Sequence, residues 1–437
     1  MWPYHPDLLA TPVPRYTSYP TAAEFDGSVG EKDQLAALAQ VSGAVSLYLH
    51  IPFCEQICWY CGCNTAAANK RSRLEAYLDA LHHDIALTGA KLGKRGEIRR
   101  IAFGGGSPNA LQPTDFVRLA DALTVHMPLE SPEWSVEIDP RHLTSAWVSV
   151  LAVIGVTKAS LGVQTFSPRL QQAIGRVQPD EEIERATALL RRGGITSLNF
   201  DLMYGLPGQT MEDLEATLAR TVELGADRVA LFGYAHVPHM IPRQKRIDAS
   251  ALPGQDERFA MAAFGHEFFT RAGYVPVGFD HFARPGDPMA EAVRNGTLRR
   301  NFQGFTEDRA DFLVGLGATA ISCFPDVIVQ NEKNAGTYRS ILSEDRLPGA
   351  LGVRRDAQDQ ARAAIIEALL CQGRAKVGGE LLADLREGLR PFIERGLAAI
   401  DGEWLSITPA GLPYARTIAA RFDVYRQDSL RRFSSAV

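Results

Sequence analysis

The sequence lacks the features of membrane, secreted and nucleic-acid-binding proteins. No apolar run among its 437 residues reaches the roughly 18 residues of a membrane span. The first residues, MWPYHPDLLATPVPRYTSYPT, lack the basic segment and apolar segment of a secretory signal. The formal net charge of −5 gives no electrostatic reason to expect a nucleic acid or an anionic membrane as partner. We therefore expect a monomeric cytoplasmic protein that acts on small molecules.

Cysteine is scarce, and its placement excludes a disulfide framework. The chain has six cysteines, four of them within HIPFCEQICWYCGCN, residues 50–64. A disulfide-stapled secreted domain has cysteines spread along a short chain, whereas a tight cluster in a reducing cell indicates metal binding or catalysis. The other two, Cys323 and Cys371, stand alone, and we expect each to be a buried, unreactive thiol.

Internal repeats and low-complexity segments are also absent, and the 46% apolar and 22% charged residues are typical of a packed globular protein. Short apolar runs alternate with segments of helical periodicity, which predicts βαβ units and a parallel sheet. Six strands and five helices are expected: strands at 46–52, 99–105, 134–140, 158–164, 197–205 and 227–235, and helices at 74–92, 114–127, 144–155, 180–194 and 211–225. We predict an α/β fold with an open partial (β/α)6 barrel, with a doubly wound sheet as the alternative.

The rest of the chain predicts smaller units. Residues 274–288 are expected to add an edge to the sheet, and residues 289–345 to form a linker with some helix. From about residue 355 the pattern is helical, and Asp401-Gly402 between two apolar runs predicts a hairpin. A last helix over 412–426 would complete a small winged-helix-like domain. The expected divisions are a substrate-covering segment (1–40), the barrel (41–290), a linker or barrel extension (291–350) and a helical domain (351–437).

The clustered cysteines favour an iron–sulfur cluster over a structural zinc site. Structural zinc usually takes two separated pairs of ligands, whereas here all four cysteines lie on one loop. Cys54, Cys58 and Cys61 can face one cluster, which leaves Cys63 over. Because a cubane cluster normally takes one thiolate per iron, three ligands leave one iron open. An open coordination position is typical of a catalytic metal site.

The spacing C-x-x-x-C-x-x-C resembles that of the radical S-adenosylmethionine enzymes. The resemblance implies that the amino and carboxylate groups of S-adenosylmethionine bind the open iron of a [4Fe–4S] cluster. It also implies that Tyr60, before the third cysteine, packs near the adenine. The partial barrel is this family's fold as well. The glycine run at 104–106, where backbone can approach a ligand closely, is similar to the family's glycine motif.

Further segments resemble the oxygen-independent coproporphyrinogen III oxidases: PRYTSYPTA (14–22), GVQTF (162–166), DLMYGLPGQT (201–210), YAHVP (234–238), DHFARPGDP (280–288) and RNFQGFT (300–306). The resemblance implies two molecules of S-adenosylmethionine. Carried over by position, the contacts of the first are Tyr48, Gly105, Glu137 and Ile321, and those of the second are Gly106, Ser107, Gln164, Arg176, Asp201 and Ala235. Tyr48 and Cys63 join the three cluster ligands as catalytic candidates. Ser107-Pro108-Asn109 in place of Thr-Pro-Thr, and Lys158 in place of Arg, depart from the family pattern.

The implied reaction is the oxidative decarboxylation of two propionates of coproporphyrinogen III to vinyl groups, giving protoporphyrinogen IX. A flavodoxin- or ferredoxin-like electron donor and an unidentified electron acceptor are implied as partners. Anionic propionates require cations and polar donors, and the macrocycle requires apolar cover. The candidates for these contacts are Arg15, Arg284, Arg299, Arg300, Phe302, Tyr16 and Tyr19.

Other functions stay open at this point. A heme-binding chaperone and a heme-degrading radical methyltransferase belong to the same superfamily, although a chaperone is expected to lack Cys63 and the PRYTSYPT segment. A non-catalytic, metal-stabilised binding protein is the alternative from another class. The net negative charge and the absence of a basic recognition helix argue against DNA as its ligand.

Overall fold

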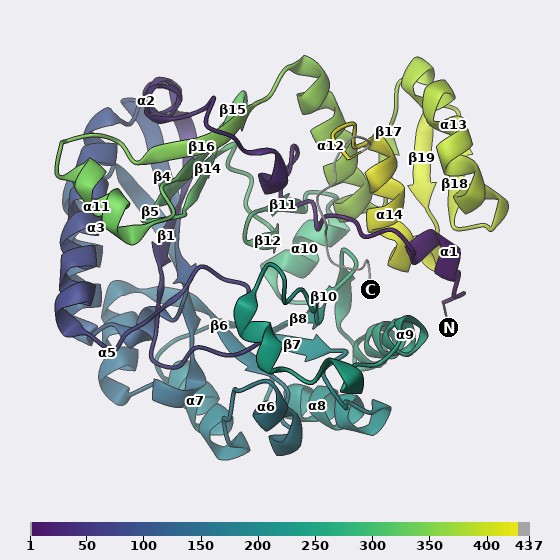
Figure 1. Ribbon diagram of the computed structural model, residues 1–437, viewed down its shortest axis with the longest axis horizontal. Helices are drawn as coiled ribbons and strands as arrows, with labels where there is room; N and C mark the ends of the chain where they lie inside the picture. The colour runs from purple at the N-terminus through teal and green to yellow at the C-terminus, as the bar shows by residue number, and fades with distance from the viewer. Residues whose placement is uncertain (1, 427–437) are drawn as a thin grey trace.

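The computed structural model describes residues 2–426 and is built on one twelve-stranded sheet (Figure 1). Its six central strands are parallel neighbours in chain order: β1 (Ser42–Ile51), β4 (Arg95–Gly105), β5 (Leu129–Ile138), β6 (Val156–Gln164), β7 (Ser197–Tyr204) and β8 (Arg228–Gly233). A doubly wound sheet would reverse the strand order near its middle. The sequential order therefore confirms the predicted partial barrel.

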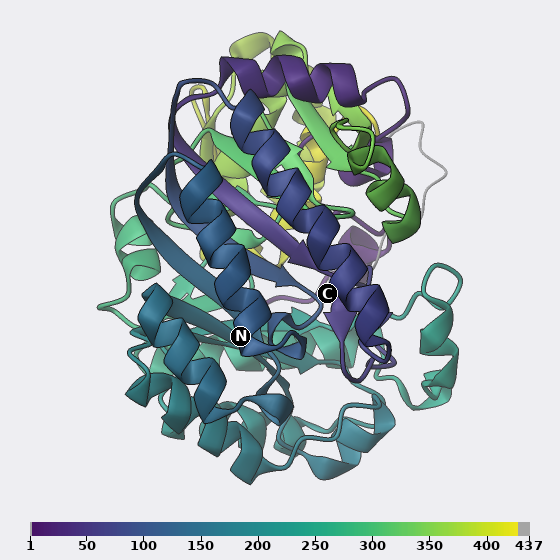
Figure 2. The same ribbon diagram turned by 90° about the vertical axis from the view of Figure 1, so that its left-hand side faces the viewer.

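The predicted helices connect these strands on the outside of the sheet, as the side view shows for the first of them (Figure 2). They are α3 (Arg71–Lys91), α4 (Pro113–His126), α5 (Ser145–Ile154), α7 (Asp180–Arg192) and α8 (Met211–Glu223). Two further helices, α6 (Pro168–Ala173) and α9 (Gln255–Arg271), follow β6 and β8. None of the helices within residues 2–426 is long and apolar enough to cross a bilayer.

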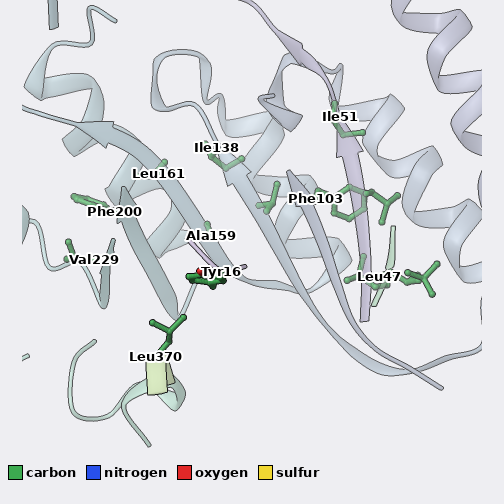
Figure 3. Packing of buried hydrophobic residues seen from close by; sticks show 14 of the residues in the cluster. Tyr16, Leu47, Ile51, Phe103, Ile138, Ala159, Leu161, Phe200, Val229 and Leu370 are labelled. Atoms are coloured by element: carbon green, nitrogen blue, oxygen red, sulfur yellow. The ribbon is translucent and has the colours of Figure 1, made fainter. Parts of the chain in front are cut away.

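Apolar side chains of neighbouring strands form one core (Figure 3). Leu161 and Phe200 are fully buried in it, and the Phe103 ring stacks on Trp134 with ring centroids 6.1 Å apart. Burying a large apolar side chain stabilises the fold by about 1.5–3 kcal/mol. The core thus fixes the strands whose carboxyl ends carry the site.

The sheet extends beyond the six central strands at both edges. On one side β13 (Phe312–Leu316) pairs parallel to β1, and the antiparallel strands β14 (Ile321–Cys323), β15 (Val327–Asn331) and β16 (Gly349–Arg354) follow. On the other side β10 (His281–Ala283) and β9 (Val275–Val277) continue from β8. Residues 289–345 therefore extend the sheet and contain some helix, and they are not a mere linker. That region also holds α10 (Pro288–Arg294), β11 (Arg299–Asn301), β12 (Gly304–Thr306) and α11 (Ala335–Leu342).

The C-terminal region contains the predicted helices and hairpin. α12 (Ala357–Gln372) and α13 (Gly379–Glu394) pack with the strands β17 (Arg374–Lys376), β18 (Ala398–Asp401) and β19 (Trp404–Ile407). Asp401 pairs with Trp404, so the hairpin turns at Gly402-Glu403. The single helix expected over 412–426 is instead broken into η6 (Pro409–Tyr414), α14 (Ala415–Ala419) and η7 (Ala420–Phe422). Pro413, which cannot donate a backbone hydrogen bond, lies at this break.

The N-terminal segment crosses from the C-terminal region to the opposite edge of the sheet (Figure 1). Near α1 (Pro6–Leu9), the Asp7 carboxylate pairs with Arg395 at 2.8 Å. At the other end, α2 (Glu31–Gln40) lies against β15 and β16, and Gln34 donates to the Asn331 side chain at 3.2 Å. The segment between them therefore passes close to the open side of the barrel.

Candidate active site

The four clustered cysteines lie on the loop that follows β1. Cys54 ends β2 (Phe53–Cys54), which pairs with β3 (Ala66–Ala67) and closes the loop at its base. The Trp59 backbone N–H donates to the Ile174 carbonyl at 3.1 Å, which ties the middle of the loop to the end of α6. The loop borders a cavity of about 630 Å³, and all four cysteines line it.

Hydrogen-bond donors surround the sulfur atoms of the three predicted ligands. Arg176 Nη1 lies 3.2 Å from Cys58 Sγ, Ser107 Oγ lies 3.8 Å from Cys54 Sγ, and the Cys63 N–H lies 3.4 Å from Cys61 Sγ. The hydrogen bond from the Cys63 side chain lowers the pKa of the Cys61 thiol to about 6, against the effect of burial. Such donors stabilise thiolates, which are the form that binds metal.

Cys54, Cys58 and Cys61 border one cavity, and a hydrogen-bond donor lies near each of their sulfur atoms. Within residues 2–426, no three His, Cys, Asp or Glu side chains converge tightly enough to hold a single metal ion. A cubane cluster does not require such convergence because each thiolate binds its own iron. The three cysteines, with basic and hydroxyl donors to their sulfurs, are therefore the residues that would hold the cluster.

The glycines at the end of β4 allow its backbone to pack directly against the cysteine loop. A Cβ atom on Gly106 would lie 2.5 Å from the Phe53 carbonyl oxygen, and one on Gly105, whose φ is +105°, would lie 2.3 Å from the His50 ring. The Gly106 N–H donates to the Ile51 carbonyl at 2.7 Å. The close approach that the glycine run predicted is thus made to the cysteine loop itself.

Two carboxylates, Glu137 on β5 and Asp201 on β7, lie on the strands at either side of β6. The Glu137 side chain accepts a hydrogen bond from the Gly105 N–H at 3.0 Å, and burial raises its pKa to about 7. The Asp201 side chain accepts from Ser160 at 3.0 Å and Asn199 at 2.8 Å, and burial raises its pKa above the usual value. Both acids line the cysteine cavity and can accept hydrogen bonds from ligand hydroxyl or amino groups.

A buried ionic network contacts the cysteine loop. Arg176 donates to the Gly162 carbonyl at 2.7 Å and lies 3.5 Å from Asp139. Asp139 also pairs with Arg141, which donates to the Gln56 side chain at 2.9 Å. These cations lower the Asp139 pKa to about 2, although burial opposes them. Asp139 and Arg141 were not among the predicted site residues, although they lie one and three residues after β5, the strand that carries Glu137.

A second cavity of about 800 Å³ lies beside the first. The residues predicted for the first S-adenosylmethionine, Tyr48, Gly105, Glu137 and Ile321, all line this second cavity. Five of the residues predicted for the second S-adenosylmethionine line the cysteine cavity: Gly106, Ser107, Gln164, Arg176 and Asp201. Tyr60 lines the same cavity. Both cavities are lined by Cys63, Gly105 and Glu137, so they adjoin at these residues.

Ala235 does not line either of these cavities. It lines a small cavity of about 40 Å³ that shares Arg15 and Gly233 with the cysteine cavity. The Gln244 amide donates both to the Ala235 carbonyl, at 3.0 Å, and to the Tyr60 carbonyl on the cysteine loop, at 2.9 Å. Gln244 is therefore a loop-positioning residue that no sequence motif indicated.

The predicted substrate residues lie in different parts of the structure. Arg15 lines the cysteine cavity and pairs with Asp280 at 3.5 Å, and Phe302 lines the second cavity. Arg299 pairs with Glu367 at 2.9 Å, and the half-buried Arg300 donates to the Arg15 carbonyl at 3.1 Å.

Arg284 is exposed and lies far from both cavities along the strand direction. Its neighbour Ala283 pairs with Arg228, the first residue of β8, whereas the site lies beyond the last residues of the strands. The structure therefore does not bring Arg284 together with the other predicted site residues.

Tyr16 and Tyr19 are buried and bind the C-terminal region. Tyr16 donates to the Asp423 carboxylate at 2.9 Å, and Tyr19 accepts from the Val424 N–H at 3.2 Å. They belong to the packing of the core, and Figure 3 shows Tyr16 there. Burial raises the pKa of both the Cys323 and the Cys371 thiols, as expected of unreactive cysteines.

Comparisons with known proteins agree on one family. The family model of the Radical SAM superfamily matches residues 48–221. The oxygen-independent coproporphyrinogen III oxidase of Bradyrhizobium diazoefficiens is 39% identical over 437 residues, which cover 97% of each chain. That of Paracoccus denitrificans is 41% identical over 432 residues, which cover 96% of this chain and 95% of the relative. The solved coproporphyrinogen III oxidase of Escherichia coli, described as a radical SAM enzyme, superposes with a TM-score of 0.90 at 33% identity and covers 97% of this chain and 99% of its own.

Proposed function

The chain belongs to the family of oxygen-independent coproporphyrinogen III oxidases, and from this premise we propose that it converts two propionates of coproporphyrinogen III to vinyl groups with loss of CO2. One observation carries the proposal. Cys54, Cys58 and Cys61 border one cavity together with polar groups from four further strand ends, which matches a cluster with an open iron and a polar cofactor beside it.

We propose that Cys54, Cys58 and Cys61 hold a [4Fe–4S] cluster and that two molecules of S-adenosylmethionine bind beside it. When bound, these groups supply a 5′-deoxyadenosyl radical that can take a hydrogen atom from an unactivated propionate carbon. Support for two molecules comes from the two adjoining cavities of about 630 and 800 Å³. The second cavity is lined by the first contact set and the cysteine cavity by the second, apart from Ala235, and Gly105 and Glu137 line both cavities.

The chain's own residues would bind and orient these molecules. Glu137 and Asp201 would accept hydrogen bonds from hydroxyl or amino groups, and Glu137 stands where the two cavities meet. The Gly105–Gly106 backbone keeps the cysteine loop against β4. Arg15 at the cavity edge would attract an anionic propionate. Correct placement of the reacting carbon is the main contribution that a protein makes to such chemistry.

The remaining elements of the function follow from the same proposal. The protein would act as a cytoplasmic monomer. It would receive one electron from a flavodoxin- or ferredoxin-like donor for each cofactor cleavage and pass the substrate electron to an acceptor.

The deciding experiment is anaerobic turnover. Reconstituted protein, dithionite, S-adenosylmethionine and coproporphyrinogen III are mixed without oxygen, and the porphyrins are separated after oxidation. Protoporphyrin with equivalent CO2 is expected. Retention of added heme without any decarboxylation would instead indicate a heme chaperone, and heme degradation a radical methyltransferase.

A further inference from the structure

A short basic segment packs against the outside of the cysteine loop. It comprises His239–Arg246 and includes the one-turn helix η4 (Pro242–Arg246). Arg243 donates to the Cys63 carbonyl at 3.3 Å and to the Thr65 hydroxyl at 3.0 Å. Gln244 donates to the Tyr60 carbonyl at 2.9 Å. The segment is therefore held directly on the loop that carries the predicted cluster ligands.

The outer face of this segment is positively charged in a protein that is negative overall. Residues 242–246 contain three cations and no acid, whereas the whole chain has a net charge of −5. Lys245 and Arg246 are exposed, and neither forms a salt bridge within residues 2–426. The nearby Asp248 carboxylate accepts hydrogen bonds from the N–H and the hydroxyl of Ser250, so it is bound to its own turn.

Apolar side chains lie beside these cations. The Arg246 guanidinium stands over the Trp59 ring at 6.0 Å, and Trp59 directly follows Cys58 in the cysteine loop. Met240, in the same segment, is 63% exposed and adds apolar surface there. Cations around an aromatic ring and an exposed thioether form a surface to which an acidic protein with an exposed flavin edge is complementary.

We propose that Trp59, Met240, Lys245 and Arg246 form the docking surface for a reduced, acidic flavodoxin-type protein. The inference rests on the proposed function, which requires an electron for the cluster. In the docked complex one electron passes from the reduced flavin to the oxidised cluster, so the flavin is oxidised by one electron and the cluster reduced by one. Electron-transfer complexes are commonly small and weak, and charge complementarity guides their association.

Charge reversal of Lys245 and Arg246 tests the proposal. The variant Lys245→Glu/Arg246→Glu is compared with Arg386→Glu/Arg390→Glu, which places the same charge change on exposed positions of α13. Formation of 5′-deoxyadenosine is measured once with reduced flavodoxin and once with dithionite as electron source. Flavodoxin binding to the cluster-loaded protein is measured separately by calorimetry at low and high salt.

The 245/246 variant is expected to raise the KM for flavodoxin and its Kd by about tenfold or more at low salt, with a smaller effect at high salt. Its dithionite-driven rate should equal that of the wild type, and the α13 variant should match the wild type in every assay. Unchanged flavodoxin KM and Kd in the 245/246 variant would overturn the docking surface. Failure of the wild type to cleave S-adenosylmethionine even with dithionite would instead refute the proposed function.

Discussion

The Arg176 guanidinium lies 3.2 Å from the sulfur of Cys58, and both residues are buried. The Gly162 carbonyl and the Asp139 carboxylate hold the same guanidinium in place. A fixed cation next to a cluster ligand stabilises the reduced cluster, which carries one more negative charge than the oxidised cluster.

We therefore predict that Arg176→Met lowers the midpoint potential of the reconstituted cluster, by on the order of tens of millivolts. Potentiometric titration followed by electron paramagnetic resonance would measure the shift. Arg169→Met is the control because Arg169 is exposed and pairs with Asp213 instead. Equal potentials in both variants, with equal iron content, would show that the Arg176 cation has no influence on the cluster.

Replacement of single cysteines should separate the ligands from Cys63. Cys54→Ala, Cys58→Ala and Cys61→Ala are each expected to lose the four irons and four sulfides and the cleavage of S-adenosylmethionine. Cys63→Ala should retain the cluster and lose porphyrin turnover. Iron and sulfide analysis after anaerobic reconstitution provides the measurement. If Cys63→Ala lost its iron as completely as the other three variants, the assignment of three ligands would be wrong.

The strand end at Gly105 should be far less tolerant of a side chain than a similar glycine elsewhere. Gly105 and Gly155 both have positive φ, +105° and +85°, but a Cβ at Gly155 meets nothing within 4 Å, whereas one at Gly105 overlaps the His50 ring. Gly155→Ala should cost about 1 kcal/mol of unfolding free energy from backbone strain alone. Gly105→Ala should cost more, by about 1–3 kcal/mol, because of overpacking. Urea unfolding of the two metal-free variants compares them, and equal losses would exclude the collision.

The six central strands could be predicted because each is buried and is marked by a pattern in its own short segment of sequence. Strands such as β6 and β7 appear as short apolar runs between turns, and the helices between them have clear periodicity. β13 and β14 were missed because they are only five and three residues long. β13 also contains Gly315 and is stabilised by pairing with the distant strand β1. Short strands of this kind lack a local signal.

The same limit applies to the site. Glu137, Gln164 and Asp201 could be predicted because they stand at or near strand ends. The bridge from Gln244 to the Tyr60 carbonyl joins residues 184 positions apart, and no local pattern marks it. Arg284 was misplaced because the antiparallel direction of β10, which carries it away from the site, is not visible in the sequence.

Glu137 should make the stability of the metal-free protein depend on pH. Burial raises its folded pKa from 4.5 to about 7, so the folded state binds the proton more tightly than the unfolded state. Its contribution to stability is therefore complete below about pH 4.5 and is lost as the pH rises through about 7.

Glu137→Gln is expected to remove this dependence and to make the metal-free protein more stable than the wild type at pH 8. Denaturant unfolding at pH 5, 6, 7 and 8 would detect the difference, with Glu133→Gln, at a half-buried residue of the same strand, as control. Parallel pH profiles for the wild type and Glu137→Gln would contradict the raised pKa.

Replacement of Arg15 and replacement of Arg284, which lie at opposite ends of the barrel, should affect the KM for coproporphyrinogen III differently. Arg15 lines the cysteine cavity, and its guanidinium stands over the Phe232 ring at 4.8 Å. Arg284 lies near the Tyr274 ring at the beginning of the strands and donates to the Tyr274 hydroxyl at 3.4 Å.

Loss of a charge-assisted hydrogen bond to a carboxylate typically costs about 1.5–3 kcal/mol. Arg15→Ala is therefore expected to raise the KM for coproporphyrinogen III at least about tenfold, with dithionite-driven cofactor cleavage preserved, and Arg284→Ala to leave the KM unchanged. Steady-state anaerobic kinetics of the two variants would decide, and an effect of Arg284→Ala equal to that of Arg15→Ala would contradict a propionate contact at the cavity edge.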